Sequence, residues 1–207
     1  MTPRDAVLLR QLLALLWRHL RAGRGRGDAV AAEIQRIEAG LDHVGNSPRP
    51  WPQSPSPLGP ILDAALADVG DPDLAGVLRI IGPHLPWRYG YAPRSDAPGL
   101  ENRMGWAELV GPEAPFLSSS ICLGLTVIGP NTHYLPHRHP AVEVYLVLAG
   151  HALWWGEGLT TEPPPGAFIL HPSQAVHAMR TGTEPLLALY TWSGDIQSPS
   201  VWAESPA

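Results

Sequence analysis

Two histidines and a glutamate lie close together in the second half of the 207-residue chain, at His137, His139 and Glu143. Imidazole nitrogens and carboxylate oxygens are the ligands that divalent transition metals such as Zn, Fe, Mn and Ni take in proteins. If the segment from residue 137 to 145 is extended, its odd-numbered side chains share one face, and Tyr145 joins the three candidate ligands. The segment therefore predicts a metal site beside a tyrosine.

The other face of this segment is apolar and suits packing, with Val142, Val144 and Leu146 in alternate positions. A surface loop that happens to carry histidines is the alternative interpretation of a single histidine pair. His177, in a second segment, extends the polar pattern and favours a metal site, because an unpaired polar cluster inside a protein core is costly.

Short apolar or alternating segments predict the strands that would position these side chains. Gly, Pro and Asn separate them, as is typical of a sandwich or barrel. We expect a mainly β domain over residues 86–207. The predicted strands are Trp106–Val110, Ser118–Ile128, Ala141–Ala149, His151–Trp155, Ala167–His171, Ala175–Arg180 and Leu186–Trp192.

Residues 1–85 instead predict an α-helical segment packed on that barrel. Thr2 and Pro3 form a helix start, leucines follow at helical spacing, and Asp28 caps a second helix after a glycine-rich stop. Proline and serine predict a loop over residues 46–60, and shorter helical patterns cover 60–68 and 72–82. The leucine stripe would face the barrel or form a homodimer contact.

Charge and composition limit the partners that we expect. A net charge of −5 gives no basic surface for nucleic acid. Arginines and an aspartate interrupt the leucine-rich N-terminus every few residues, which fits neither a signal peptide nor a membrane span. We therefore expect a cytoplasmic protein that acts on a small molecule, without a nucleic-acid or membrane partner.

The metal-site residues also stand in the spacing of two motifs of the cupin superfamily, which the chain resembles over residues 118–193. The resemblance implies an antiparallel β-barrel, the double-stranded β-helix, with His137, His139, Glu143 and His177 as metal ligands. Gln174 and Thr181 depart from the second motif. The matching positions are His137, His139, Glu143 and Gly150 in the first motif, and Gly166, Pro172 and His177 in the second.

A narrower resemblance is to the cupin-type dimethylsulfoniopropionate lyases, some of which carry a helical N-terminal segment of similar length. It implies that Tyr145 is the catalytic base, that Tyr134 and Trp192 line the substrate pocket, and that His137 is a metal ligand or a neighbour of the ligands. The segments that carry it are Tyr134-Leu-Pro-His137-Arg-His139-Pro-Ala-Val-Glu143-Val-Tyr145, Pro172-Ser-Gln-Ala-Val-His177-Ala-Met179 and Tyr190-Thr-Trp192.

The implied reaction is a β-elimination that gives dimethyl sulfide and acrylate. Tyr145 would remove the proton α to the substrate carboxylate, and the metal would bind that carboxylate and stabilise the developing charge. Aromatic faces attract the sulfonium cation. Candidate walls are Tyr134, Tyr190, Trp192, Trp154 and Trp155, of which the adjacent pair can place only one ring inside a barrel.

Several alternatives stay open at the level of sequence. Tyr145 could be an inward barrel residue that donates a hydrogen bond, and the aromatic residues could be ordinary core. The same ligands would serve another metal-dependent cupin enzyme, such as an Fe(II) dioxygenase, or a cupin that senses a small ligand without catalysis. The native metal, the choice between dimethylsulfoniopropionate and a related acid, and the oligomeric state are not specified. His171 has no motif role but shares strand parity with His177.

Overall fold

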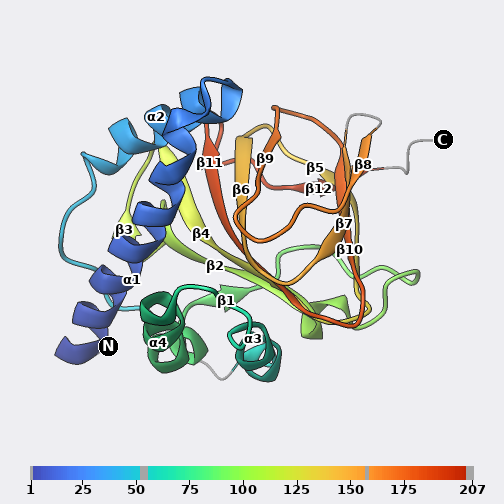
Figure 1. Ribbon diagram of the computed structural model, residues 1–207, viewed down its shortest axis with the longest axis horizontal. Helices are drawn as coiled ribbons and strands as arrows, with labels where there is room; N and C mark the ends of the chain where they lie inside the picture. Colours follow the sequence, from blue (N-terminus) through green and yellow to red (C-terminus); the bar gives the residue numbers. More distant parts are fainter. Residues whose placement is uncertain (1, 52–55, 157–158, 204–207) are drawn as a thin grey trace.

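The computed structural model describes residues 2–51, 56–156 and 159–203, with helices in the first part of the chain and strands in the second (Figure 1). The α-helices are α1 (Pro3–Arg21), α2 (Ala29–Leu41), α3 (Gly59–Ala65) and α4 (Pro72–Ile81). Short 3₁₀ turns cover Ala22–Arg26, Gly82–His84 and Leu100–Asn102. The strands are β1 (Trp87–Arg88), β2 (Met104–Gly111), β3 (Phe116–Leu117), β4 (Ile121–Ile128), β5 (His133–Arg138), β6 (Val142–Ala149), β7 (Ala152–Gly156), β8 (Leu159–Thr161), β9 (Phe168–His171), β10 (His177–Thr181), β11 (Leu186–Ser193) and β12 (Val201–Trp202).

The helices begin where the capping residues predict. The Thr2 side chain accepts a hydrogen bond from the Asp5 backbone, and Asp5 returns one to Thr2, which together form a capping box. Asp28 caps α2 by accepting a hydrogen bond from the backbone of Ala31. The predicted loop over residues 46–60 ends two residues early, because α3 begins at Gly59, and its residues 52–55 lie outside the described part of the chain.

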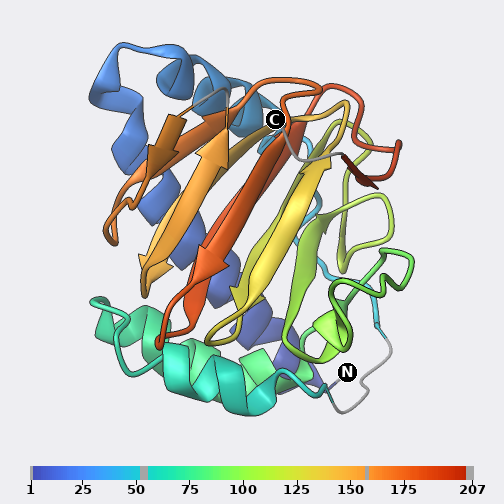
Figure 2. The same ribbon diagram turned by 90° about the vertical axis from the view of Figure 1, so that its right-hand side faces the viewer.

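The strands form two sheets that face each other in a cupin barrel (Figure 2). One sheet has the order β1-β2-β4-β11-β6-β9, with β3 parallel to β2, and the other has the order β12-β5-β10-β7-β8. Each predicted strand corresponds to an observed one, although the strand predicted from Ser118 begins at Ile121. The short strands β1, β3, β8 and β12 carry no alternating pattern long enough to predict.

The larger sheet is buried on both faces. Its outer face packs against the helices, which cover that side of the barrel (Figures 1 and 2). Its inner face carries a separate cluster that includes Tyr145 and Tyr190. Within the described part of the chain, no helix combines the length and hydropathy that crossing a bilayer requires. The outer cluster contains Leu9, Leu12, Leu16 and Ile34 from the helices and Leu123, Leu125, Val144, Leu146, Leu187 and Leu189 from the sheet.

The segment that carries the metal-site residues is not one extended strand. β5 ends at Arg138 and β6 begins at Val142, and the two strands belong to different sheets. Pro140 lies in the turn between them, where its missing N–H interrupts the strand ladder. His137 and Glu143 therefore belong to different sheets, with His139 in the turn between them.

Candidate metal centre and active-site cavity

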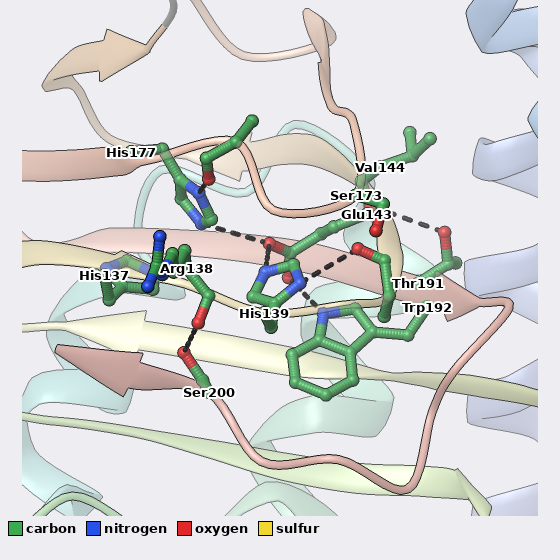
Figure 3. A network of polar contacts seen from close by, with 12 residues as sticks. His137, Arg138, His139, Glu143, Val144, Ser173, His177, Thr191, Trp192 and Ser200 are labelled. Carbon is green, nitrogen blue, oxygen red and sulfur yellow. Dashed lines mark hydrogen bonds and ion pairs between the residues drawn. The ribbon is translucent and has the colours of Figure 1, made fainter. Parts of the chain in front are cut away.

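Three polar side chains converge in the barrel interior (Figure 3). His139, Glu143 and His177 each offer one ligand atom, and these atoms lie within 4.8 Å of one another. The Nε2 atoms of His139 and His177 lie 2.9 and 3.4 Å from the same carboxylate oxygen, Oε2 of Glu143. All three residues are at least 98% buried. Two imidazoles and a carboxylate in this arrangement suit a divalent metal ion.

Backbone carbonyl groups orient the imidazole rings. The Nδ1 atom of His139 donates to the carbonyl of Ala141, and that of His177 donates to the carbonyl of Ala175, each at 3.0 Å. Because a carbonyl can only accept, Nδ1 carries the proton and Nε2 faces Glu143, as metal-binding histidines require. Among the described residues, Nε2 of His177 has no hydrogen-bond partner. The three residues therefore fit a metal ion.

The electrostatics keep the carboxylate of Glu143 ionised. Burial disfavours its charge, but His139 and His177 hold the pKa of Glu143 well below its usual range. Burial likewise opposes the charge of His139, yet Glu143 raises the pKa of this imidazole. When His139 carries a second proton, on Nε2, that proton lies between imidazole and carboxylate, and a metal ion bound by both groups would displace it.

Trp192 holds the second oxygen of the carboxylate. Its indole Nε1 donates a hydrogen bond of 2.8 Å to Oε1 of Glu143. Its ring also lies beside that of His139, with centroids 4.4 Å apart. We expected Trp192 to be a wall of the substrate pocket, and it does line the cavity. The structure adds a contact that fixes the orientation of Glu143.

His137 lies beside the three converging residues. Among the described residues, the group whose ligand atoms converge consists of His139, Glu143 and His177, without His137. Its ring stacks on Tyr134 at 3.9 Å, lies 4.1 Å from the ring of His177, and donates through Nδ1 to the carbonyl of Leu135. Burial and His177 hold the pKa of His137 well below its usual value, so the imidazole is neutral. The geometry separates His137 from the other three expected ligands.

Tyr145 follows Glu143 at the next inward position of β6. It is 3% exposed and lines the same cavity as Glu143. Burial and the negative charge of Glu143 raise the pKa of Tyr145 well above its ordinary value, and a hydrogen bond with Thr126 acts in the opposite direction. In the absence of a cation the residue is therefore a phenol.

The cavity has a volume of roughly 690 Å³ and is open to solvent on one side. Tyr134 and Tyr190 line it, as the sequence led us to expect. Tyr91, which the sequence did not single out, also lines it. The Tyr91 hydroxyl hydrogen-bonds to Tyr134 and, at 2.6 Å, to Ser200, and its ring stacks on Trp202 at 4.0 Å. The pairing of β12 with β5 places Trp202 beside this wall of the cavity.

The remaining candidate residues lie around the site or away from it. Trp154 is buried inside the barrel, whereas its neighbour Trp155 is half-buried and contacts His133, as expected for adjacent strand positions. His171 stacks on His177 at 3.9 Å, and burial together with His177 lowers its pKa to about 3. It pairs with Glu143 across β6 and β9 and is a neutral support for the site.

The fold and the converging residues are those of a cupin. A family model for dimethylsulfoniopropionate lyase matches residues 30–188, and the chain belongs to that family. It is 33% identical over 190 residues to the dimethylsulfoniopropionate lyase DddQ of Ruegeria pomeroyi, which covers 83% of this chain and 91% of the relative.

Two crystal structures resemble the whole fold. A structure from work on the DMSP lyases RdDddP and RnDddQII has a TM-score of 0.79 and 26% identity, with 97% of this chain and 100% of the other covered. The structure of DMSP lyase DddQ from Ruegeria pomeroyi has a TM-score of 0.78 and 27% identity, with 98% of each chain covered. The helical segment is therefore part of the shared fold.

Proposed function

We propose that the protein is a metal-dependent lyase that cleaves dimethylsulfoniopropionate into dimethyl sulfide and acrylate. Membership of the family supports the substrate class. The observation that carries the proposal is the placement of Tyr145 beside a buried group of two histidines and a carboxylate whose Nε2 and Oε2 atoms converge. We assign a divalent ion to His139, Glu143 and His177, with Zn, Fe, Mn and Ni as candidates.

The reaction requires a base for the proton α to the substrate carboxylate. Tyr145 takes this role as a phenolate: its oxygen accepts the α-proton, the C–H electron pair forms the carbon–carbon double bond, and the carbon–sulfur bond breaks. Dimethyl sulfide leaves with the electron pair of that bond, and acrylate remains. When bound, the metal ion supplies positive charge, which favours the phenolate and stabilises negative charge developing on the substrate carboxylate.

Neighbouring aromatic residues position the substrate in this proposal. His137 and Tyr134 form a stacked pair on the cavity wall next to His177. We assign them to substrate binding, because His137 lies outside the converging ligand atoms of the described residues. The Tyr134 hydroxyl hydrogen-bonds to that of Tyr91, which in turn donates to Ser200, and this chain of contacts limits the movement of Tyr134.

Substitution of Tyr145 by Phe tests the proposed base. The variant should lose at least about a hundredfold in kcat, in line with the usual contribution of general-base catalysis. Dimethyl sulfide in the headspace is measured over protein loaded with each candidate metal, and bound metal is quantified in the same samples. Normal turnover by Tyr145→Phe would contradict the assigned base, and metal-loaded native protein without any dimethyl sulfide would contradict the lyase function.

One observation favours a second candidate function. Two histidines and one carboxylate are also the facial ligand set of non-haem Fe(II) oxygenases, and His139, Glu143 and His177 supply that set. An Fe(II) dioxygenase would consume oxygen when the Fe(II)-loaded protein meets a thiol substrate. Oxygen uptake without release of dimethyl sulfide from dimethylsulfoniopropionate would select this alternative.

A further inference from the structure

The cavity extends along the larger sheet to a second polar region, formed by Arg88 of β1, Glu108 of β2 and Glu113. The Arg88 guanidinium lies 3.0 Å from a carboxylate oxygen of Glu108 and 3.6 Å from one of Glu113. The formal charges of the three groups sum to −1, and Glu108 is the more buried carboxylate, with a side chain 12% exposed against 82% for Glu113. This end of the cavity is therefore suited to a cation.

The register of the larger sheet places Glu108 in line with the proposed base. Glu108 pairs with Gly124, Gly124 with Tyr190, and Tyr190 with Tyr145. Adjacent strands lie about 4.8 Å apart, so three steps separate the Cα atoms of Glu108 and Tyr145 by about 14 Å along the sheet. Both side chains line the cavity, so the space between them is open to a small ligand.

Two glycines make room for this arrangement. A Cβ atom at Gly124 would lie 2.7 Å from the ring of Tyr190, so the ring leans over this strand toward Glu108. A Cβ atom at Gly111 would lie 2.3 Å from the Glu108 carboxylate. The register of β2 also shifts just after Glu108, and such bulges re-aim side chains near functional sites.

The Tyr190 hydroxyl points to a ligand in the same space. The residue is 5% exposed and lines the cavity, yet its hydroxyl has no hydrogen bond to any described residue. Burial and the charges of Glu108 and Glu143 raise the pKa of Tyr190 well above its ordinary value, so the residue lies within electrostatic reach of both carboxylates. The hydroxyl oxygen is open to the cavity, where it can contact a bound ligand. Its ring, with that of Trp106, offers a face to a cation.

We propose that Glu108, with Tyr190 and Trp106, forms the subsite that recognises the substrate by the positive charge of its sulfonium group. The inference rests on the proposed lyase function, because it assigns the carboxylate end of the substrate to the His139, Glu143 and His177 end of the cavity. Glu108 then determines specificity for a cationic head group. An acid of similar shape with an uncharged thioether in place of the sulfonium would bind weakly.

The chemistry predicts how this contact acts on kinetics. The sulfonium charge disappears as the carbon–sulfur bond breaks, since dimethyl sulfide leaves as a neutral molecule. An anion beside the sulfur therefore stabilises the bound substrate at least as much as the transition state. Substitution of Glu108 by Gln should raise KM for dimethylsulfoniopropionate at least about tenfold and leave kcat undiminished.

A pair of unreactive isosteres tests the charge recognition without turnover. One, the cationic isostere, is trimethylammonium propionate, and the other, the neutral isostere, has a quaternary carbon in place of the nitrogen; the names refer to the head group, since both keep the carboxylate. Calorimetry on the metal-loaded protein should show that Glu108→Gln weakens binding of the cationic isostere at least about tenfold and leaves that of the neutral isostere unchanged. Glu184→Gln removes the same charge from an exposed turn outside the cavity and should change neither affinity.

A second variant, expected to strengthen the preference for the cationic isostere, keeps the test valid if Glu108→Gln fails to fold. Arg88 is 40% exposed in its side chain, and Arg88→Gln removes the cation that competes for Glu108. In this variant, the affinity for the cationic isostere divided by that for the neutral isostere should rise roughly two- to fivefold. The proposal is overturned if Glu108→Gln weakens both isosteres equally, if it weakens neither, or if Arg88→Gln lowers the ratio.

The two proposals fail in different ways. If the native protein releases no dimethyl sulfide but still prefers the cationic isostere in a Glu108-dependent manner, the lyase reaction is wrong and the cation subsite stands. If dimethyl sulfide is released and Glu108→Gln leaves both KM and the isostere ratio unchanged, the lyase stands and the subsite is wrong.

Discussion

Trp192 supports the candidate metal centre through one hydrogen bond, from its indole nitrogen to Oε1 of Glu143. Substitution of Trp192 by Phe keeps an aromatic ring and removes that donor. A carboxylate that has lost such a partner is less well oriented, and metal affinity typically falls 10- to 100-fold, so we expect a loss of about tenfold. Competition with a coloured chelator measures the change.

The matched control is Trp155→Phe, which alters a half-buried tryptophan that does not line the cavity and contacts His133. It should bind metal like the native protein. Equal metal affinity in Trp192→Phe and native protein would mean that Trp192 acts only as a wall of the cavity.

Residue spacing was enough to predict the part of the site that is local in sequence. His139 and Glu143 lie four residues apart, and His177 stands in a second recognisable motif, so all three could be named before the structure was known. Tyr91 and Glu108 could not be named, because Tyr91 lies in the segment after β1 and Glu108 reaches the cavity through the pairing of β2 with β4. His137 matched the motif, yet its placement outside the converging atoms depends on the barrel corner at Pro140.

At the scale of elements, alternating hydrophobicity predicted the long strands but not the corner between β5 and β6. The sequence predicted a strand over Ala141–Ala149 and treated residues 137–145 as extended only by hypothesis, and β5 was not among the predicted strands. The chain instead changes sheets at Pro140. The helix ends were predicted more closely, because capping residues act locally, as Thr2 and Asp28 do.

The contact between α2 and the barrel depends on a glycine. A Cβ atom at Gly40 of α2 would lie 2.6 Å from a methyl carbon of Ile121 in β4, a buried residue that has little room to move. Gly40→Ala should therefore lower the free energy of unfolding by about 1–3 kcal/mol, the usual cost of overpacking. Urea denaturation followed by circular dichroism measures the change.

Gly76 of α4 provides the control, since a Cβ atom there would meet nothing within 4 Å. Gly76→Ala should raise the free energy of unfolding by about 0.5–1 kcal/mol through helix propensity alone. If Gly40→Ala were stabilising to the same extent, α2 would not be held as closely against β4 as the structure indicates.

At the scale of the whole molecule, the candidate metal centre joins the two sheets of the barrel. Glu143 lies on β6 in the larger sheet, and His177 lies on β10 in the smaller one. An ion held by both residues would connect the sheets from inside, while the helices cover the larger sheet from outside. Metal binding should therefore stabilise the whole fold in addition to serving the reaction.

Removal of the metal should lower the melting temperature of the native protein. A ligand that binds only the folded state, at a concentration about 1,000 times its Kd, stabilises the fold by about 4 kcal/mol. For a chain of this size, about 2–4 °C corresponds to each kcal/mol, so we expect chelation to lower Tm by about 10 °C. Calorimetric scans before chelation, after chelation and after return of each candidate ion measure the shift.

His177→Ala, which removes a ligand, should melt at the same temperature with and without chelator, whereas Tyr145→Phe should keep the shift. A shift that persists in His177→Ala would place the stabilising ion elsewhere in the molecule.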